Sequence, residues 1–242
     1  MTEAFEISGL PSEGGILIVV DHASSAIPDD IDLGIPPEYE QDHIAYDPGI
    51  APIARLMTEN MGYLAILSTA SRLIVDLNRY PDEAAVIVES SDCVEIPGNH
   101  LSAEERQARL DRFFTPYHNR LGALIADLKP ALVASLHSFS PTLRSAPQVE
   151  RPWDIGVMYN QYKTAPRLAI QFLEEEGGLK VGDQLPYSGE DLNATMNRQC
   201  EAIGQPYIGV EVRQDLIREE AGQRRFAEIL LRTCDKIRTA LA

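Results

Sequence analysis

Cysteine and tryptophan are scarce in this chain of 242 residues, which contains three cysteines and one tryptophan. Cys93, Cys200 and Cys234 are far apart, odd in number and outside any Cys-x-x-Cys motif. This pattern predicts free thiols, and it excludes both a disulfide framework and a thiolate zinc site.

Long apolar runs and a secretion signal are also absent. No run reaches the roughly 18 apolar residues that a membrane-spanning helix needs. The first six residues lack the basic and apolar regions of a signal peptide. We therefore expect a cytoplasmic protein that has no membrane partner.

Basic residues are outnumbered: 21 Lys and Arg stand against 37 Asp and Glu, for a formal net charge of −16. Such a surface repels nucleic acids and anionic membranes, which excludes them as partners. A small anionic substrate can still bind where arginines line a pocket. We expect one domain over residues 1–242, as a monomer or small homo-oligomer.

Several short apolar runs stop abruptly at polar residues. Ile16–Val20 runs into Asp21-His22. Uniformly apolar runs of this length are typical of strands buried on both faces, whose carboxyl ends carry ligand sites. Three further runs have this form: 73–77 precedes Asn78-Arg79, 131–136 precedes His137, and 207–210 precedes Glu211 and Arg213. If these strands are parallel neighbours, two histidines, an acid and several arginines meet at one edge, which indicates a metal hydrolase site.

Apolar runs alternate with helical patterns along the chain. This alternation predicts an α/β fold with a mixed, mostly parallel sheet and helices on both faces. A capping box at Ser102–Glu105 marks a helix start. We expect strands at 16–21, 63–67, 72–77, 131–136, 155–159 and 207–212, and helices at 49–61, 102–127 (bent or broken near Pro116), 164–176, 191–203 and 215–240.

His22 and His137 are the candidate metal ligands. Zinc accepts histidine nitrogen and carboxylate oxygen, and a catalytic zinc site has three protein ligands. Asp47 is our candidate for the third ligand, although it could instead be the N-cap of the helix after Pro48. His43, four residues earlier, is a spare candidate.

Glu211 and the arginines supply the remaining chemistry. Glu211 is either a general base beside the metal or a salt-bridged acid on a half-exposed strand. Arg72 and Arg79 bracket the 73–77 run with Asn78 between them. Because the guanidinium fork pairs with carboxylates, this spacing indicates a substrate-binding element.

Four stretches together resemble the N-formylglutamate amidohydrolase family: 21–25, 71–79, 136–138 and 211–215. The Ser-Arg-x-x-x-Asp-x-Asn-Arg stretch is the most specific of them. The resemblance implies a phosphorylase/hydrolase-like fold, similar to zinc carboxypeptidases and aspartoacylase. It also implies hydrolysis of N-formyl-L-glutamate to formate and L-glutamate, a step of histidine degradation.

Residue by residue, His22 and His137 match the metal histidines of the family. Glu211 corresponds to the catalytic glutamate, and Arg72 to the arginine that polarises the scissile carbonyl. Asn78-Arg79 match the pair that holds a substrate carboxylate. Carboxypeptidase-like sites read His-x-x-Glu, whereas here the fourth position is Ser25, so the third ligand stays open between Asp47, Ser25 and His43.

Arg144 and Arg213 are candidates for a second substrate carboxylate, and Tyr187 for the pocket wall. The cofactor we expect is a divalent metal, most readily zinc, and the partner a small N-acyl amino acid. Two alternatives stay open. The protein could be a deacylase or carboxypeptidase for another N-acyl amino acid, or a dicarboxylate-binding protein without turnover.

Overall fold

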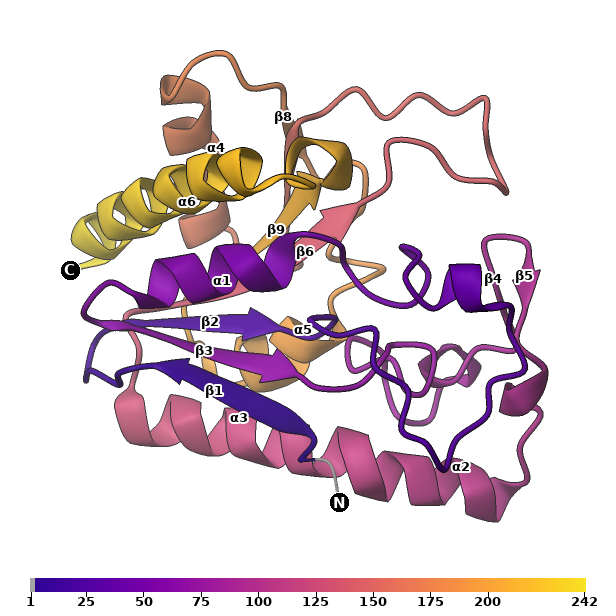
Figure 1. Ribbon diagram of the computed structural model, residues 1–242. Helices are drawn as coiled ribbons and strands as arrows, with labels where there is room; N and C mark the ends of the chain where they lie inside the picture. Colours follow the sequence, from indigo (N-terminus) through magenta and orange to yellow (C-terminus); the bar gives the residue numbers. More distant parts are fainter. Residues whose placement is uncertain (1–2) are drawn as a thin grey trace.

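The computed structural model describes residues 3–242 and is built around one seven-stranded sheet (Figure 1). The strand order is β1-β3-β2-β6-β9-β7-β8. β1 pairs antiparallel with β3 and β7 antiparallel with β9, whereas the other pairs are parallel. The predicted mixed, mostly parallel sheet is therefore confirmed. Its strands are β1 Phe5–Gly9, β2 Ile16–Val20, β3 Tyr63–Ser68, β6 Leu132–Phe139, β7 Ile155–Met158, β8 Val181–Asp183 and β9 Tyr207–Arg213.

Helices cover both faces of the sheet, as predicted. Figure 1 shows α1, α4 and α6 on one side and α2 and α3 on the other. The sheet has one hydrophobic core on each face, and side chains of β2 alternate between them. Ile18 and Val20 pack in one core, and Leu17 and Val19 in the other. The helices are α1 Ile50–Thr58, α2 Ala103–Arg109, α3 Thr115–Leu128, α4 Thr164–Glu175, α5 Ala194–Gln199 and α6 Glu220–Leu241.

The helix that follows Ser102 begins with the predicted capping box. Ser102 Oγ accepts the Glu105 N–H, and the Glu105 carboxylate accepts the Ser102 N–H. The predicted irregularity lies just before Pro116, where a π-helical turn at Leu110–Phe114 joins α2 to α3. The chain therefore stays helical through this region.

The predicted strand at 72–77 is wrong. This segment runs as turns, with Leu73, Ile74 and Val75 buried. Its backbone bonds to other loops, since the Asp76 N–H donates to Val86 O at 2.7 Å. The apolar run indicated burial, and it did not indicate an extended backbone.

Two sheet strands, β1 and β8, were not predicted. β1 reads Phe-Glu-Ile-Ser-Gly and is largely exposed, and β8 has three residues. Edge strands of this kind lack the uniformly apolar run that marks central strands. The hairpin of β4 Ser90–Ser91 and β5 Val94–Glu95 is equally short. Short 3₁₀ turns lie at Pro37–Tyr39, Ala84–Val86, Pro97–Asn99, Glu201–Ile203 and Gln214–Leu216.

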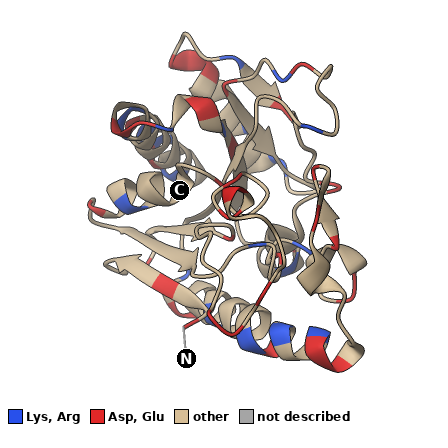
Figure 2. Ribbon diagram, turned by 45° about the vertical axis from the view of Figure 1, so that its right-hand side comes forward, with Lys and Arg blue, Asp and Glu red and all other residues tan. Residues whose placement is uncertain are grey.

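Charged residues lie mainly on the helices and loops that surround the sheet (Figure 2). None of the helices within residues 3–242 combines the length and the apolar character needed to cross a bilayer.

Candidate metal centre and active site

The central strands bring the predicted residues to one end of the sheet. β2, β6 and β9 are parallel neighbours. His22 follows β2 by two residues, and His137 of β6 lies opposite Glu211 of β9 in the strand register. All three side chains line one cavity at this end.

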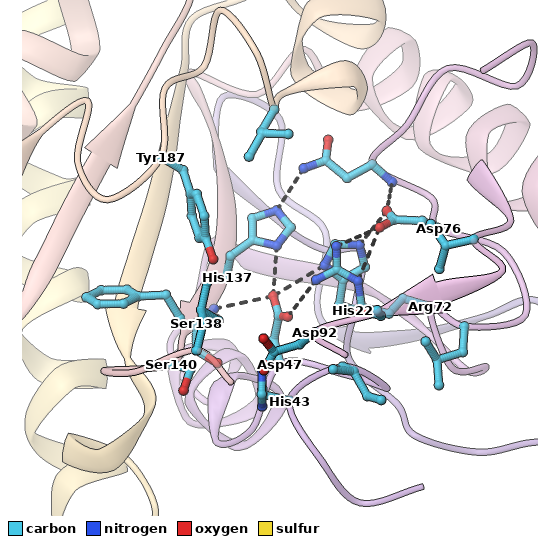
Figure 3. Close-up of a pocket in the computed structure, with 18 of the residues that line it drawn as sticks. His22, His43, Asp47, Arg72, Asp76, Asp92, His137, Ser138, Ser140 and Tyr187 are labelled. Atoms are coloured by element: carbon cyan, nitrogen blue, oxygen red, sulfur yellow. Dashed lines mark hydrogen bonds and ion pairs between the residues drawn. The ribbon is translucent and has the colours of Figure 1, made fainter. Parts of the chain in front are cut away.

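Asp47 lies between the two histidines (Figure 3). Its Oδ2 is 3.3 Å from His22 Nδ1 and 2.9 Å from His137 Nδ1. The N-cap of α1 is Gly49, so the alternative that Asp47 caps this helix is wrong. At Gly49, φ is +83°, and a Cβ there would lie 2.4 Å from Ile217 O, so the turn that presents Asp47 requires glycine.

The other two candidates for the third ligand point elsewhere. Ser25 Oγ accepts a hydrogen bond from Gln41. His43 Nδ1 is 2.7 Å from Asp42 Oδ1, and its Nε2 is 3.1 Å from Asp92 Oδ2. The geometry therefore favours Asp47.

His22, Asp47 and His137 fit a divalent cation. One ligand atom from each lies within 4.8 Å of the others, and all three residues are buried. Two imidazole nitrogens and one carboxylate oxygen form a donor set that zinc accepts. Although burial alone would raise it, the pKa of Asp47 is held well below its usual range by His22 and His137. The centre thus holds an ionised carboxylate that faces two nitrogens.

Arg72 braces this centre from the side. Its guanidinium donates to Asp76 Oδ2 from Nε (3.2 Å) and Nη2 (2.6 Å), and to Asp47 Oδ1 from Nη1 (3.3 Å). Burial disfavours the charge, but Asp76 and Asp47 outweigh it and raise the pKa of Arg72. Three of the five guanidinium N–H groups are used in this way, which leaves two for a ligand.

Glu211 is buried, at 6% exposure, and its Oε2 has no hydrogen-bond partner within residues 3–242. Burial raises the pKa of Glu211 to about 7, against the opposing charges of His137 and Arg72. A salt-bridged acid on an exposed strand would have neither property, so the alternative reading of Glu211 is wrong. The carboxylate is free to act on a molecule in the cavity.

Comparison with known proteins identifies the family. The family model of N-formylglutamate amidohydrolase matches residues 14–218. The chain belongs to this family. It is therefore an amidohydrolase, a hydrolase that acts on amide bonds.

Two solved structures share the fold of this chain. A gene product of Agrobacterium tumefaciens is 28% identical, with a TM-score of 0.92 over 99% of this chain and 96% of the other. The N-formylglutamate amidohydrolase of Ralstonia eutropha JMP134 is 18% identical, with a TM-score of 0.77 over 99% of this chain and 100% of the other. The second likeness shows a shared fold. No curated protein matches the chain.

Three of the five predicted substrate residues line the cavity of this family member. Asn78 Nδ2 lies 3.5 Å from His137 Nε2, and the Asn78 Oδ1 accepts the Thr195 N–H at 3.0 Å. Arg79 and Tyr187 complete the three.

Arg144 and Arg213 are not among the residues that line the cavity. Arg144 forms an ion pair with Asp42 at 2.9 Å. Arg213 forms ion pairs with Asp154 at 3.4 Å and with Asp215 at 2.8 Å. Since their guanidinium groups are already paired, we do not retain these two predictions for a second carboxylate.

Sequence reasoning assigned no role to Asp76 or Arg151. Asp76 Oδ1 lies 2.8 Å from His22 Nε2, and this aspartate is part of the Ser-Arg-x-x-x-Asp-x-Asn-Arg stretch, which could have revealed it. Arg151 lies in the loop before β7 and stacks on Tyr187. No local motif marks Arg151, because only the fold brings it against Tyr187, which lines the cavity.

Proposed function

We propose that this protein is a metal-dependent amidohydrolase that converts N-formyl-L-glutamate and water to formate and L-glutamate. The observation that carries the proposal is the unpartnered buried oxygen of Glu211, which lies in the same cavity as His22, Asp47 and His137. A buried carboxylate without a partner is costly, and it persists where it has a catalytic role. Family membership supplies the substrate class.

His22, Asp47 and His137 would hold the cation. A divalent metal there, most readily zinc, would polarise the formyl carbonyl and make a nearby water more acidic. Glu211 accepts the proton of that water as the water oxygen bonds to the formyl carbon. Glu211 then returns the proton to the amine nitrogen as the C–N bond breaks, which releases formate and L-glutamate.

Three other residues orient the substrate. The two unused N–H groups of Arg72 can donate to the formyl oxygen as it gains negative charge. Arg79, beside Asn78, binds a substrate carboxylate through its guanidinium fork. Tyr187 forms the opposite wall, on the other side of His137 from Arg72 (Figure 3).

The direct test is formate release from N-formyl-L-glutamate. It compares native protein, protein stripped of metal by a chelator, and stripped protein given zinc, with the metal content measured each time. We expect activity that disappears on stripping and returns with zinc. Activity in fully stripped protein would overturn the metal dependence.

A metal-containing protein that releases no formate would contradict the substrate. A panel of N-acetyl amino acids and short peptides then separates the alternatives. A deacylase cleaves the first group and a carboxypeptidase the second, whereas a binding protein cleaves neither. With activity confirmed, we place the enzyme in the last step of a cytoplasmic histidine degradation route.

A further inference from the structure

The arginines at or near the cavity differ in whether they already form an ion pair with a carboxylate of the protein. Arg72 is paired with Asp76 and Asp47. Arg79 and Arg151 have no carboxylate within ion-pair distance in residues 3–242, and their hydrogen bonds go to carbonyl oxygens. Arg79 Nη1 donates to Asn78 O at 2.9 Å, and Arg151 Nη1 donates to Ser140 O at 3.0 Å.

Arg79 and Arg151 are among several arginines without a carboxylate partner in the described part of this protein. Its formal net charge is −16, so carboxylates are abundant over the rest of the chain. A guanidinium that has found no partner there retains N–H donors for an anion from solution. Arg79 lines the cavity, and Arg151 contacts the lining residues Ser140 and Tyr187, so both guanidinium groups are available to an anion held there.

Aromatic side chains fix the position of Arg151. Its guanidinium carbon lies 4.8 Å from the centre of the Tyr187 ring and 5.9 Å from that of Phe139. Tyr187, Phe139 and Ser140 all line the cavity. A guanidinium over a ring face keeps its N–H donors. Apart from the Nη1 bond to Ser140 O, those of Arg151 remain available to bind a carboxylate.

The charge of Arg151 acts on the reaction centre. Burial raises the pKa of Glu211, and the positive charges of His137, Arg72 and Arg151 oppose this rise. The positive charge of Arg151 therefore acts on the carboxyl group that the proposed reaction uses.

We propose that Arg151 binds the side-chain carboxylate of a dicarboxylic N-acyl amino acid, while Arg79 binds the α-carboxylate. The α-carboxylate is one carbon from the scissile amide and must lie close to the metal ligands. Asn78, next to Arg79, is at this place, because its Nδ2 lies 3.5 Å from His137 Nε2. The side-chain carboxylate extends further, toward the wall formed by Tyr187. This assignment rests on the proposed function, and it makes Arg151 the residue that selects acidic over neutral substrates.

The test compares three substrates: N-formyl-L-glutamate, N-formyl-L-glutamine and N-formyl-L-isoglutamine, which lack neither carboxylate, the side-chain carboxylate and the α-carboxylate, respectively. For Arg151→Gln we expect kcat/KM to fall about 10- to 100-fold on N-formyl-L-glutamate, mainly through KM. On N-formyl-L-glutamine we expect a change of no more than about twofold, because the group that Arg151 binds is already missing.

Arg167→Gln is the matched control. Arg167 also stacks on a tyrosine, Tyr159, at 5.4 Å, but it pairs with Asp183 away from the cavity. This variant also removes one positive charge, and it should leave kcat/KM unchanged on all three substrates. Arg151→Lys keeps the charge but loses the planar fork, and should give an intermediate loss.

An equal loss on all three substrates would show that Arg151 supports the fold, and would overturn the proposal. Unchanged kinetics on N-formyl-L-glutamate would also overturn it, and a loss on N-formyl-L-glutamine that spares N-formyl-L-isoglutamine would refute the assignment of the two carboxylates. If wild-type protein releases formate from none of these compounds, the proposed function fails separately. Calorimetry can then still test Arg151 by measuring the binding of the same compounds to wild-type and Arg151→Gln protein. The proposal requires wild type to bind N-formyl-L-glutamate more tightly than N-formyl-L-glutamine, and Arg151→Gln protein to lose this preference.

Discussion

Asp76 Oδ1 accepts a hydrogen bond from His22 Nε2 at 2.8 Å, on the side of the imidazole away from Asp47. When a metal ion is bound at Nδ1, the ring proton is on Nε2 and is donated to Asp76. The backbone N–H of Asn78 and the guanidinium of Arg72 hold the Asp76 carboxylate in turn. A carboxylate behind a ligating histidine fixes its tautomer and raises its basicity.

Replacement of Asp76 should therefore weaken metal binding. Asp76→Asn keeps the size of the side chain but removes the charge that polarises His22 and pairs with Arg72. We expect zinc affinity, measured by competition with a chromogenic chelator, to fall about 10- to 100-fold. Asp215→Asn, which removes a carboxylate paired with Arg213 away from the cavity, is the control. Equal zinc affinity in the two variants would refute the role of Asp76.

Glu211→Gln should separate metal binding from turnover. The variant keeps the shape of the side chain but cannot accept a proton, so we expect kcat to fall about 10²- to 10⁴-fold. The zinc content should stay at the wild-type value, because Glu211 is not in the ligand group of His22, Asp47 and His137. The test measures kcat and the number of zinc ions per protein chain in the same preparation. Near-normal turnover in a zinc-loaded variant would refute Glu211 as the base.

The central strands and the metal residues could be predicted because one physical signal marks both. β2, β6 and β9 are buried on both faces, so their sequences are apolar, apart from Ser135 in β6, until the chain reaches the cavity. Polar residues at that point, such as His22 and His137, are therefore conspicuous. Parallel pairing then brings them together, as the register of His137 opposite Glu211 shows.

The 72–79 segment could not be predicted in this way, because an apolar run reports burial whatever the backbone conformation. Its path is set by contacts with distant loops. Asn99 Nδ2 donates to Leu73 O at 2.8 Å and to Val88 O at 2.7 Å, and Arg109 Nη1 donates to Asn99 Oδ1 at 2.6 Å. Nothing local in the sequence specifies these bonds. Arg151 escaped prediction for the same reason.

These contacts predict that Asn99 stabilises the segment that carries Arg72 and Arg79. Asn99→Ala leaves the carbonyl groups of Leu73 and Val88 without their donor, and it leaves Arg109 without its amide acceptor. We expect the free energy of unfolding in urea to fall by about 2–3 kcal/mol, because buried polar groups lose their partners. KM for the substrate should rise as well, since Arg79 moves with the segment. Asn119→Ala, at an exposed helical position, is the control, and an equal effect of both substitutions would refute the prediction.

His118 should make the fold sensitive to acid. It is buried in α3, with Nε2 3.0 Å from Leu77 O and Nδ1 3.4 Å from Gln199 Nε2. Burial lowers the pKa of His118 from 6.5 to about 4. Between pH 6.5 and pH 4, His118 is protonated in the unfolded chain but neutral in the folded protein, so the free energy of unfolding falls as the pH drops through this range. Below pH 4, His118 is protonated in both states and reduces stability no further.

The difference between the two pKa values corresponds to about 3 kcal/mol of stability lost across this window. His118→Gln removes the titrating group and keeps a donor for Leu77 O. Urea unfolding of metal-free protein at pH 7.5 and pH 4.5 should show a smaller loss of stability in His118→Gln than in wild type. His100→Gln is the control, because the His100 side chain is 62% exposed and should leave the loss unchanged. If His118→Gln loses as much stability as wild type between these two pH values, His118 is not the group that destabilises the fold in acid.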